Sequence, residues 1–152
     1  MRESCRAIIF KENKVVLIYR ERENQRYYVF AGGGIEENET KEDCVIRECK
    51  EELGITVNPI KYSYKIIRDD LIQHFYLCEW RSGKLGTGNE EEYDINRKGG
   101  LQKPIFIPIE DISKLNVVPK VLKNQLLSDL GEFGNHLDDT MKIIREEKDD
   151  SE

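Results

Sequence analysis

The first thirty residues alternate short apolar segments with polar turns, a pattern typical of antiparallel strands. Residues 4–10 and 15–19 are mainly apolar and each predicts a strand, and the polar residues 11–14 between them predict a hairpin. Residues 20–26 are charged or polar and predict a loop, while the aromatic segment 27–30 predicts a short strand.

The pattern then changes to a helical period over residues 40–53. Thr40 can act as the N-cap, with Asp43 three residues later in a variant of the capping box. Four-residue spacing places three apolar residues on one face: Val45, Cys49 and Leu53. Gly54 follows, where a helix C-terminus favours glycine.

The second half of the chain predicts further strands and one long helix. The strands are expected at residues 55–57, 61–67, 71–80 and 104–109, the last being an edge strand because it contains prolines. Residues 81–103 predict a long loop, and residues 110–115 a helical turn. An amphipathic helix is expected over 118–130, with an inner face of Val121, Leu122, Gln125, Leu126 and Leu130. A single domain over 1–137 is therefore expected, followed by a charged, frayed tail over 138–152.

Composition narrows the function classes. The 152 residues suit one domain, and the formal net charge of -6 argues against a broad nucleic-acid surface. Four cysteines without CxxC spacing argue against structural zinc or disulfides and favour buried free thiols. Without an apolar run long enough for a leader or a membrane span, a cytoplasmic protein is expected.

Three carboxylates on the predicted helix carry the candidate chemistry. Glu48, Glu51 and Glu52 fall within an arc of about 100° beside the apolar stripe. Like charges at this spacing repel each other, and a hard divalent cation turns that repulsion into attraction. A solvated acidic face is the alternative in a chain this rich in glutamate.

The residues around this cluster favour the metal interpretation. From Gly33 the chain has five residues, Glu39, seven residues, and then Arg47-Glu48-Cys49-Lys50-Glu51-Glu52-Leu53-Gly54-Ile55. This resembles the Nudix box of the Nudix hydrolases, which include MutT-like enzymes. All seven fixed positions match, which random usage would produce in roughly one of 10⁵ chains of this length. Ala31, Asn38 and Cys49 depart from common family choices without touching a carboxylate.

The resemblance implies a fold, a cofactor and a set of roles. The fold is an α/β/α sandwich of the α+β type, a mixed sheet flanked by helices. Mg²⁺ or Mn²⁺ would be held by Glu48, Glu51 and Glu52, and the Gly33 carbonyl could contribute. Arg47 would orient Glu51, and Glu39 would lie near the metals. A water acidified by the metal would attack one phosphorus of a nucleotide diphosphate.

Residues outside the box are weaker candidates. In many family members a glutamate on a later loop is the general base, so Glu91 is the first choice here, with Glu90, Glu92 or Glu79 as alternatives. Arg20 and Arg22 could bind substrate phosphates, and Gly32 with Gly33 could let substrate approach the backbone closely. Tyr28 and Phe75 could stack on a base, although aromatic residues in strands are more often core.

The substrate is the least determined point. The downstream markers of the NADH, ADP-ribose and dinucleoside-polyphosphate groups are absent, which favours a nucleoside triphosphate, oxidised or not. A nucleotide-sensing domain without catalysis stays open, and so does an isopentenyl-diphosphate isomerase, although that enzyme needs more histidines than His74 and His136. Many relatives dimerise, so a homodimer also stays open.

Overall fold

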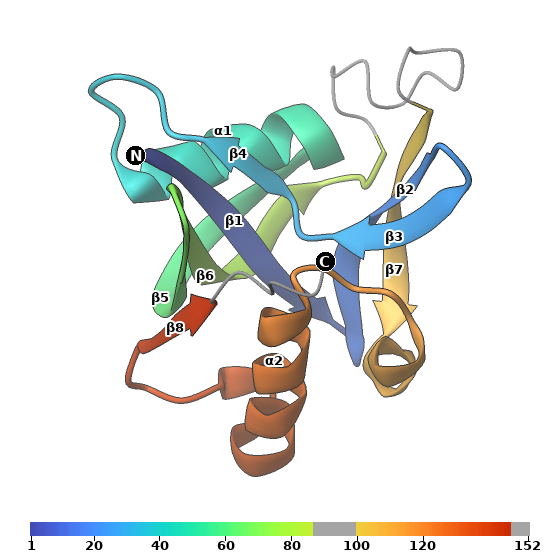
Figure 1. Cartoon of the computed structure of the whole chain (residues 1–152). Coiled ribbons are helices and arrows are strands. Elements are labelled where there is room, and N and C mark those ends of the chain that lie inside the picture. Colours follow the sequence, from blue (N-terminus) through green and yellow to red (C-terminus); the bar gives the residue numbers. More distant parts are fainter. Residues whose placement is uncertain (87–99, 147–152) are drawn as a thin grey trace.

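The strands form one mixed sheet with a helix on each face, seen in Figure 1 for the computed structural model, which describes residues 1–86 and 100–146. The strand order is β3-β2-β1-β6-β5-β8, with β4 beside β1 and β7 beside β2. The strands are β1 (Arg2–Lys11), β2 (Lys14–Arg22), β3 (Gln25–Val29), β4 (Gly32–Gly34), β5 (Ile55–Arg68), β6 (Leu71–Gly83), β7 (Leu101–Pro108) and β8 (Lys142–Glu146). The helices are α1 (Lys41–Leu53), α2 (Lys120–Phe133) and the 3₁₀ helices η2 (Ile109–Lys114) and η3 (Gly134–His136).

Two pairings make the sheet mixed. β1 runs parallel to β6 and β5 runs parallel to β8, whereas the other pairs are antiparallel. The expected fold class is thereby confirmed. None of the helices within the described residues is long and apolar enough to span a membrane.

The predicted loop over 20–26 was wrong. β2 continues to Arg22 and β3 begins at Gln25, so only Glu23 and Asn24 turn, with φ of 49° and 67°. The ladder pairs Arg20 with Tyr27 and Arg22 with Gln25. This hairpin is largely solvated, so its charged side chains do not show the alternation that marks a half-buried strand.

Two other boundaries also moved. Residues 55–57 and 61–67 belong to one strand, β5, whose register against β6 shifts at three points instead of breaking. The predicted loop over 81–103 was wrong at both ends, because β6 reaches Gly83 and β7 begins at Leu101, while residues 87–99 lie outside the described part.

The tail was the largest error in the expected organisation. Lys142–Glu146 is not frayed but forms β8, which pairs with Tyr64–Arg68 of β5. Lys142 also places its ammonium 2.6 Å from Oδ1 of Asp129, a side chain that is 1% exposed. Strand pairing and this ion pair are tertiary contacts, so they cannot be predicted from the charged local sequence.

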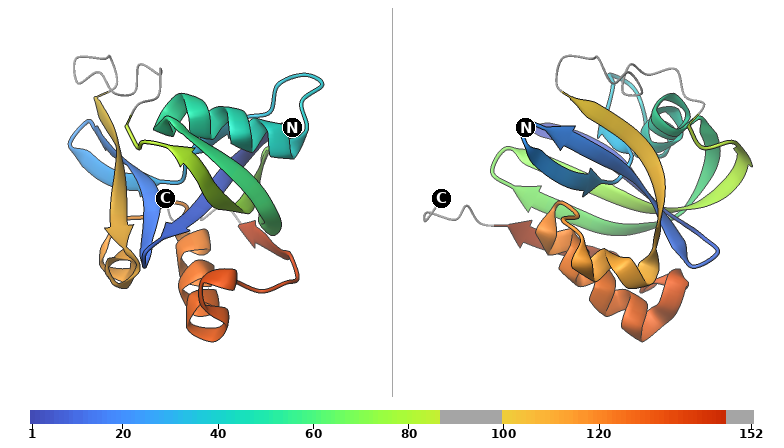
Figure 2. Two further views of the ribbon diagram at one scale, coloured as in Figure 1. Left: turned by 180° about the vertical axis from the view of Figure 1, so that it is seen from behind. Right: turned by 90° about the vertical axis from the view of Figure 1, so that its right-hand side faces the viewer.

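The two helices cover opposite faces of the sheet, as Figure 2 shows. α1 buries the predicted stripe Val45, Cys49 and Leu53 completely. On the other face, α2 buries Leu122 and Leu126, whereas Val121, Gln125 and Leu130 are only half-buried. Asp129 completes this inner face because Lys142, Gln125 and Tyr64 all donate hydrogen bonds to it.

Candidate active site

The loop before α1 and the cap of α1 fix where the glutamates lie. The Thr40 hydroxyl accepts a 3.0 Å hydrogen bond from the Asp43 amide, as predicted for the N-cap. Gly54 ends the helix in the left-handed conformation, with φ of 77°. Between these caps, α1 places Arg47, Glu48 and Glu52 against the glycines of β4. The side chain of Glu51 is more exposed, at 40%.

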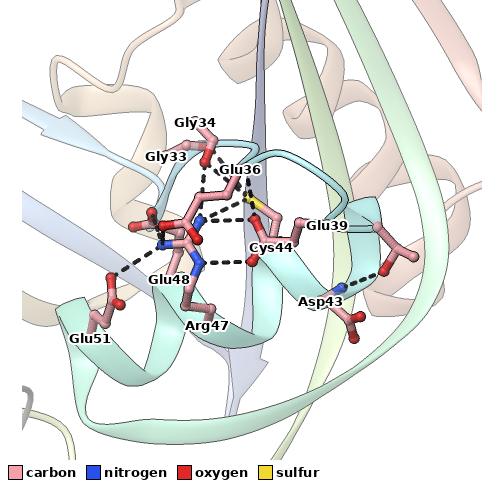
Figure 3. Close-up of polar contacts among 10 residues, drawn as sticks. Gly33, Gly34, Glu36, Glu39, Asp43, Cys44, Arg47, Glu48 and Glu51 are labelled. Carbon is pink, nitrogen blue, oxygen red and sulfur yellow. Dashed lines mark hydrogen bonds and ion pairs between the residues drawn. The ribbon is translucent and has the colours of Figure 1, made fainter.

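Arg47, in the middle of α1, is the centre of a polar network that joins the helix to the loop before it (Figure 3). Its Nε and Nη2 bind the two carboxylate oxygens of Glu39 at 2.8 and 3.0 Å. Nη1 donates to Glu48 at 2.8 Å and to Glu51 at 3.3 Å. Nη2 also donates to the Gly34 carbonyl at 3.1 Å. The expected contact with Glu51 is present, but it is the longest of the hydrogen bonds from Arg47 to a carboxylate, and Nη1 also lies 3.7 Å from Oε1 of Glu36.

The network changes the titration of its members. The hydrogen bonds from Arg47 lower the pKa of Glu39 to about 2, against a smaller opposing effect of burial. The carboxylate of Glu39, with help from Glu48, raises the pKa of the Arg47 guanidinium. Glu39 is thus held as an anion and fixes the orientation of Arg47.

Glu52 has a different environment, since its side chain is buried against the glycine segment. The Gly32 amide donates a 2.7 Å hydrogen bond to Oε1 of Glu52, which is 5% exposed. Burial raises the pKa of Glu52 to about 8, and the charge of Glu48 adds to the rise. Burial likewise raises the pKa of Glu48, although Arg47 opposes it.

The glycines allow this close approach. A Cβ on Gly32 would lie 2.2 Å from the Cys5 carbonyl oxygen, and one on Gly33 would lie 2.6 Å from Oε1 of Glu48. A Cβ on Gly34 would meet nothing within 4 Å. Gly33 therefore has a steric requirement that Gly34 lacks.

The donor set suits a divalent cation. Within residues 1–86 and 100–146, no group of three or more His, Cys, Asp or Glu side chains converges as a ready metal cluster. Glu48 and Glu51 share Nη1 of Arg47 instead. Nevertheless, burial raises the pKa of both Glu48 and Glu52, the charge of Glu48 raises the pKa of Glu52 further, and the charge of Glu51 raises that of Glu48. A hard cation with oxygen ligands relieves such repulsion. The residues present therefore fit the group.

Of the described candidate substrate-binding and base residues outside the box, only Arg20 lines a hollow near the site. Arg20 donates from Nε to Gln102 at 3.1 Å and lines a hollow of about 280 Å³ beside β1. Arg22 is exposed near the end of β2 and does not line this hollow as far as the structure describes it. Glu79 contacts Asn58 and Arg81 instead of the box. The preferred base Glu91, with Glu90 and Glu92, lies outside the described residues.

The two aromatic candidates for base stacking are also separated. Phe75 is fully buried and packs edge-on against Phe30, so it is a core residue. Tyr28 packs against Tyr19 and lines a different hollow with Lys103 and Asn116.

The hollow beside β1 contains residues that the sequence did not single out: Arg6, Arg68, Gln73 and Glu146. Arg6 gave a weak signal, since it is a charged residue within an apolar strand. Its Nη1 donates to the Phe30 carbonyl at 2.8 Å, and burial lowers its pKa, an effect that the charge of Glu52 opposes. Glu146 gave no signal, because it lies in the charged tail.

Comparison with known proteins now identifies the class. The family model described as NUDIX domain matches residues 1–123. The chain therefore belongs to the Nudix family, and the box resemblance is confirmed.

A curated protein of similar sequence has a named activity. The chain is 31% identical over 122 residues to a protein named NAD-capped RNA hydrolase NudC from Vibrio parahaemolyticus, covering 79% of this chain and 45% of the relative. The chain thus spans about half the length of this curated relative.

Solved structures share the fold. A Nudix hydrolase from Nitrosomonas europaea matches with a TM-score of 0.73 and 17% identity, covering 95% of this chain and 79% of that one. A structure of MutT, described for Aliivibrio salmonicida and Vibrio cholerae, matches with a TM-score of 0.63 and 21% identity, covering 84% and 97%.

Proposed function

We propose that this chain is a Mg²⁺- or Mn²⁺-dependent hydrolase that cleaves the diphosphate linkage of a nucleoside diphosphate joined to another group. The observation that carries the proposal is the buried carboxylate of Glu52. It lies against the Gly32 amide, with Glu48 close enough for their charges to interact. An acidic group in this position is destabilised without a cation, and family membership makes a diphosphate the natural substrate.

Glu48, Glu51 and Glu52 would hold the cation, with the Gly33 carbonyl as a further oxygen donor. When bound, the cation supplies positive charge for the diphosphate and acidifies the attacking water. Arg47 holds Glu48 and Glu51 in place, and Glu39 holds Arg47 by two hydrogen bonds. Glu51 is therefore one of the oxygen ligands, whereas Arg47 and Glu39 are positioning residues that orient the ligands and keep them charged.

The remaining roles follow the same proposal. Glu91 would take the proton of the attacking water. Arg20 would bind the substrate, since it lines the hollow of about 280 Å³ beside β1. Arg22 would bind phosphate only at the rim, because it is exposed near the end of its strand. Gly32 and Gly33 would let the diphosphate approach the backbone.

The substrate within this class is a nucleoside triphosphate, oxidised or not, on the argument from absent markers in the sequence. A second candidate is an NAD cap on RNA. The observation in its favour is the likeness to the relative named NAD-capped RNA hydrolase NudC.

The test is a turnover assay with purified protein. The panel contains nucleoside triphosphates, 8-oxo-dGTP, ADP-ribose, nucleotide sugars, dinucleoside polyphosphates, NADH and NAD-capped RNA, each with Mg²⁺, Mn²⁺ or EDTA. Wild type is compared with Glu52→Gln, which preserves shape and removes a charge. Glu132→Gln, on the exposed side of α2, is the matched control.

Metal-dependent release of a nucleoside monophosphate is expected from wild type and from Glu132→Gln. A loss of at least about 100-fold is expected for Glu52→Gln, since it removes one of few charged ligands. Tight metal-dependent binding without turnover of any substrate would contradict the hydrolase and favour a nucleotide sensor. Conversion that retains the diphosphate would favour an isomerase.

A further inference from the structure

Two adjoining hollows form a groove that runs along β1. The larger one is the hollow of about 280 Å³ lined by Arg6, Arg20, Arg68 and Glu146. The smaller one, of about 190 Å³, is lined by Ser4 and by Gly33 and Gly34 of the box segment. Both hollows share Arg6, Leu71 and Gln73 in their walls. We call this pair of hollows the Arg6 groove.

The Arg6 groove contains unsatisfied polar atoms. Within the described residues, three buried side-chain atoms have no hydrogen-bond partner: Oγ of Ser4, Nε of Arg6 and Oε2 of Glu146. All three residues line the Arg6 groove. Folded proteins satisfy most buried polar atoms, so three exceptions along one groove indicate a ligand that completes them.

In the side chains of Arg6 and Glu146, one polar atom has a partner and another buried polar atom has none among the described residues. Nη1 of Arg6 donates to the Phe30 carbonyl, which leaves Nε as a donor. Nε of Arg68 lies 3.6 Å from Oε1 of Glu146, which leaves Oε2 as an acceptor. Among the described charged side chains that line the larger hollow, Arg6 therefore offers one buried donor atom without a partner and Glu146 one buried acceptor atom without a partner. The apolar walls around them include Val29, Phe30 and Pro119.

We propose that Glu146 and Arg6 recognise the base of the substrate nucleotide, and that they select a base with an N–H beside a carbonyl. The proposal rests on the nucleotide substrate proposed above. The base occupies the larger hollow, Oε2 of Glu146 accepts from its N–H, and Arg6 donates to its carbonyl. The diphosphate extends along the smaller hollow toward Gly33.

Guanine, hypoxanthine and uracil have this edge, whereas adenine and cytosine place an amino group beside a ring nitrogen. A ring N–H next to a carbonyl is more acidic than an exocyclic amine, so it donates more strongly to a carboxylate. A carbonyl oxygen is likewise a stronger acceptor for a guanidinium. Hydrogen bonds with a charged partner are about twice as strong as neutral ones, so the pair favours the first group of bases.

Glu146 comes from the C-terminal strand. It lies beyond residues 1–123, the part that matches the family model, and it reaches the Arg6 groove because β8 pairs with β5. The register places Glu146 opposite Arg68, whose guanidinium holds its other oxygen. The C-terminal strand thus brings a specificity-determining residue to a groove otherwise built by family elements.

The test compares bases within one preparation of protein. Values of kcat/KM are measured for GTP, ITP, UTP, ATP and CTP, or for the matching series of the substrate found above. The variants are Glu146→Gln and the control Glu132→Gln. The ratio of two bases in one preparation does not depend on the fraction of folded protein, so a loss of stability cannot imitate the result.

Wild type and Glu132→Gln are expected to prefer GTP, ITP and UTP over ATP and CTP. Glu146→Gln is expected to reduce this preference by about 3-fold to 10-fold, because a neutral acceptor replaces a charged one while every base can still form a hydrogen bond. An unchanged preference in Glu146→Gln, or a wild type that prefers ATP and CTP, would overturn the inference.

A second measurement separates this inference from the proposed function. Equilibrium dialysis of GMP and AMP is performed in EDTA, where no turnover occurs. If wild type hydrolyses no substrate but binds GMP more tightly than AMP, and Glu146→Gln abolishes the difference, the hydrolase proposal fails and the base recognition holds. If turnover is found but the base ranking does not depend on Glu146, the hydrolase holds and the base recognition fails.

Discussion

Arg47 binds Glu39 through two parallel hydrogen bonds, from Nε to Oε2 at 2.8 Å and from Nη2 to Oε1 at 3.0 Å. Glu39 lies in the loop before α1, and Arg47 lies in the middle of α1. The pair therefore fixes the loop to the helix that presents the carboxylates. Lysine could not replace this arginine, because its ammonium lacks the planar fork that matches a carboxylate.

Arg47→Lys is expected to reduce kcat by at least about 10-fold, because Glu48 and Glu51 lose their fixed donor while Glu39 loses one of two bonds. The free energy of unfolding should fall by about 1–3 kcal/mol, as a partly buried network loses charged hydrogen bonds. Urea unfolding and steady-state kinetics measure the two effects. Lys50→Arg, an exposed change on the same helix, is the control, and equal losses in both variants would contradict the assigned role.

Glu52 is expected to make stability depend on pH in the absence of metal. Its pKa is about 8 in the folded protein, against an ordinary value of 4.5, so the folded state binds an extra proton between these values. The contribution of this proton to the free energy of unfolding is fully present below pH 4.5. It is lost as the pH rises through 8, which lowers the free energy of unfolding by roughly 3–5 kcal/mol. Thermal or urea unfolding in EDTA between pH 4.5 and 9 measures the slope.

Glu52→Gln should remove this part of the slope, since an amide does not titrate. Added Mg²⁺ or Mn²⁺ should raise the stability of wild type most above pH 8, where the carboxylate is charged. A slope that persists unchanged in Glu52→Gln would assign the pH dependence to another group.

The glycine segment offers a matched pair of substitutions. Gly33→Ala would place a methyl group 2.6 Å from Oε1 of Glu48, which must then move, so kcat/KM should fall by at least about 10-fold. Gly34→Ala meets nothing within 4 Å and should stay within about 2-fold of wild type. Steady-state kinetics on the two variants tests the steric argument, and similar activities for both would refute it.

Lys142 is expected to be important for stability. It donates at 2.6 Å to Asp129, where burial raises the pKa and the hydrogen bonds from Lys142, Tyr64 and Gln125 together lower it below its ordinary value. Lys142→Met leaves this buried carboxylate without its cation and should cost about 2–4 kcal/mol of unfolding free energy. Arg145→Met, exposed on the same strand, is the control for urea unfolding. Equal stability of the two variants would mean that Asp129 does not need the ion pair.

Local sequence was sufficient for α1 and its caps. Thr40, the four-residue apolar spacing and Gly54 are signals contained within one helix, and the structure uses them as predicted. The spacing from Gly33 to Ile55 likewise identified the family, because the box is one continuous segment. These features depend on neighbours along the chain, which a sequence displays directly.

Tertiary structure alone decided the features that depend on distant partners. β8 forms because β5 offers it an edge and Asp129 offers Lys142 a buried anion, although the segment itself reads as a charged tail. Arg6, Arg68 and Glu146 share a hollow only because β1, β5 and β8 meet in one sheet. The sequence by itself determined the Nudix box segment and its family. The groove beside it, with its buried atoms that lack hydrogen-bond partners among the described residues, arises from long-range strand pairing that no local pattern encodes.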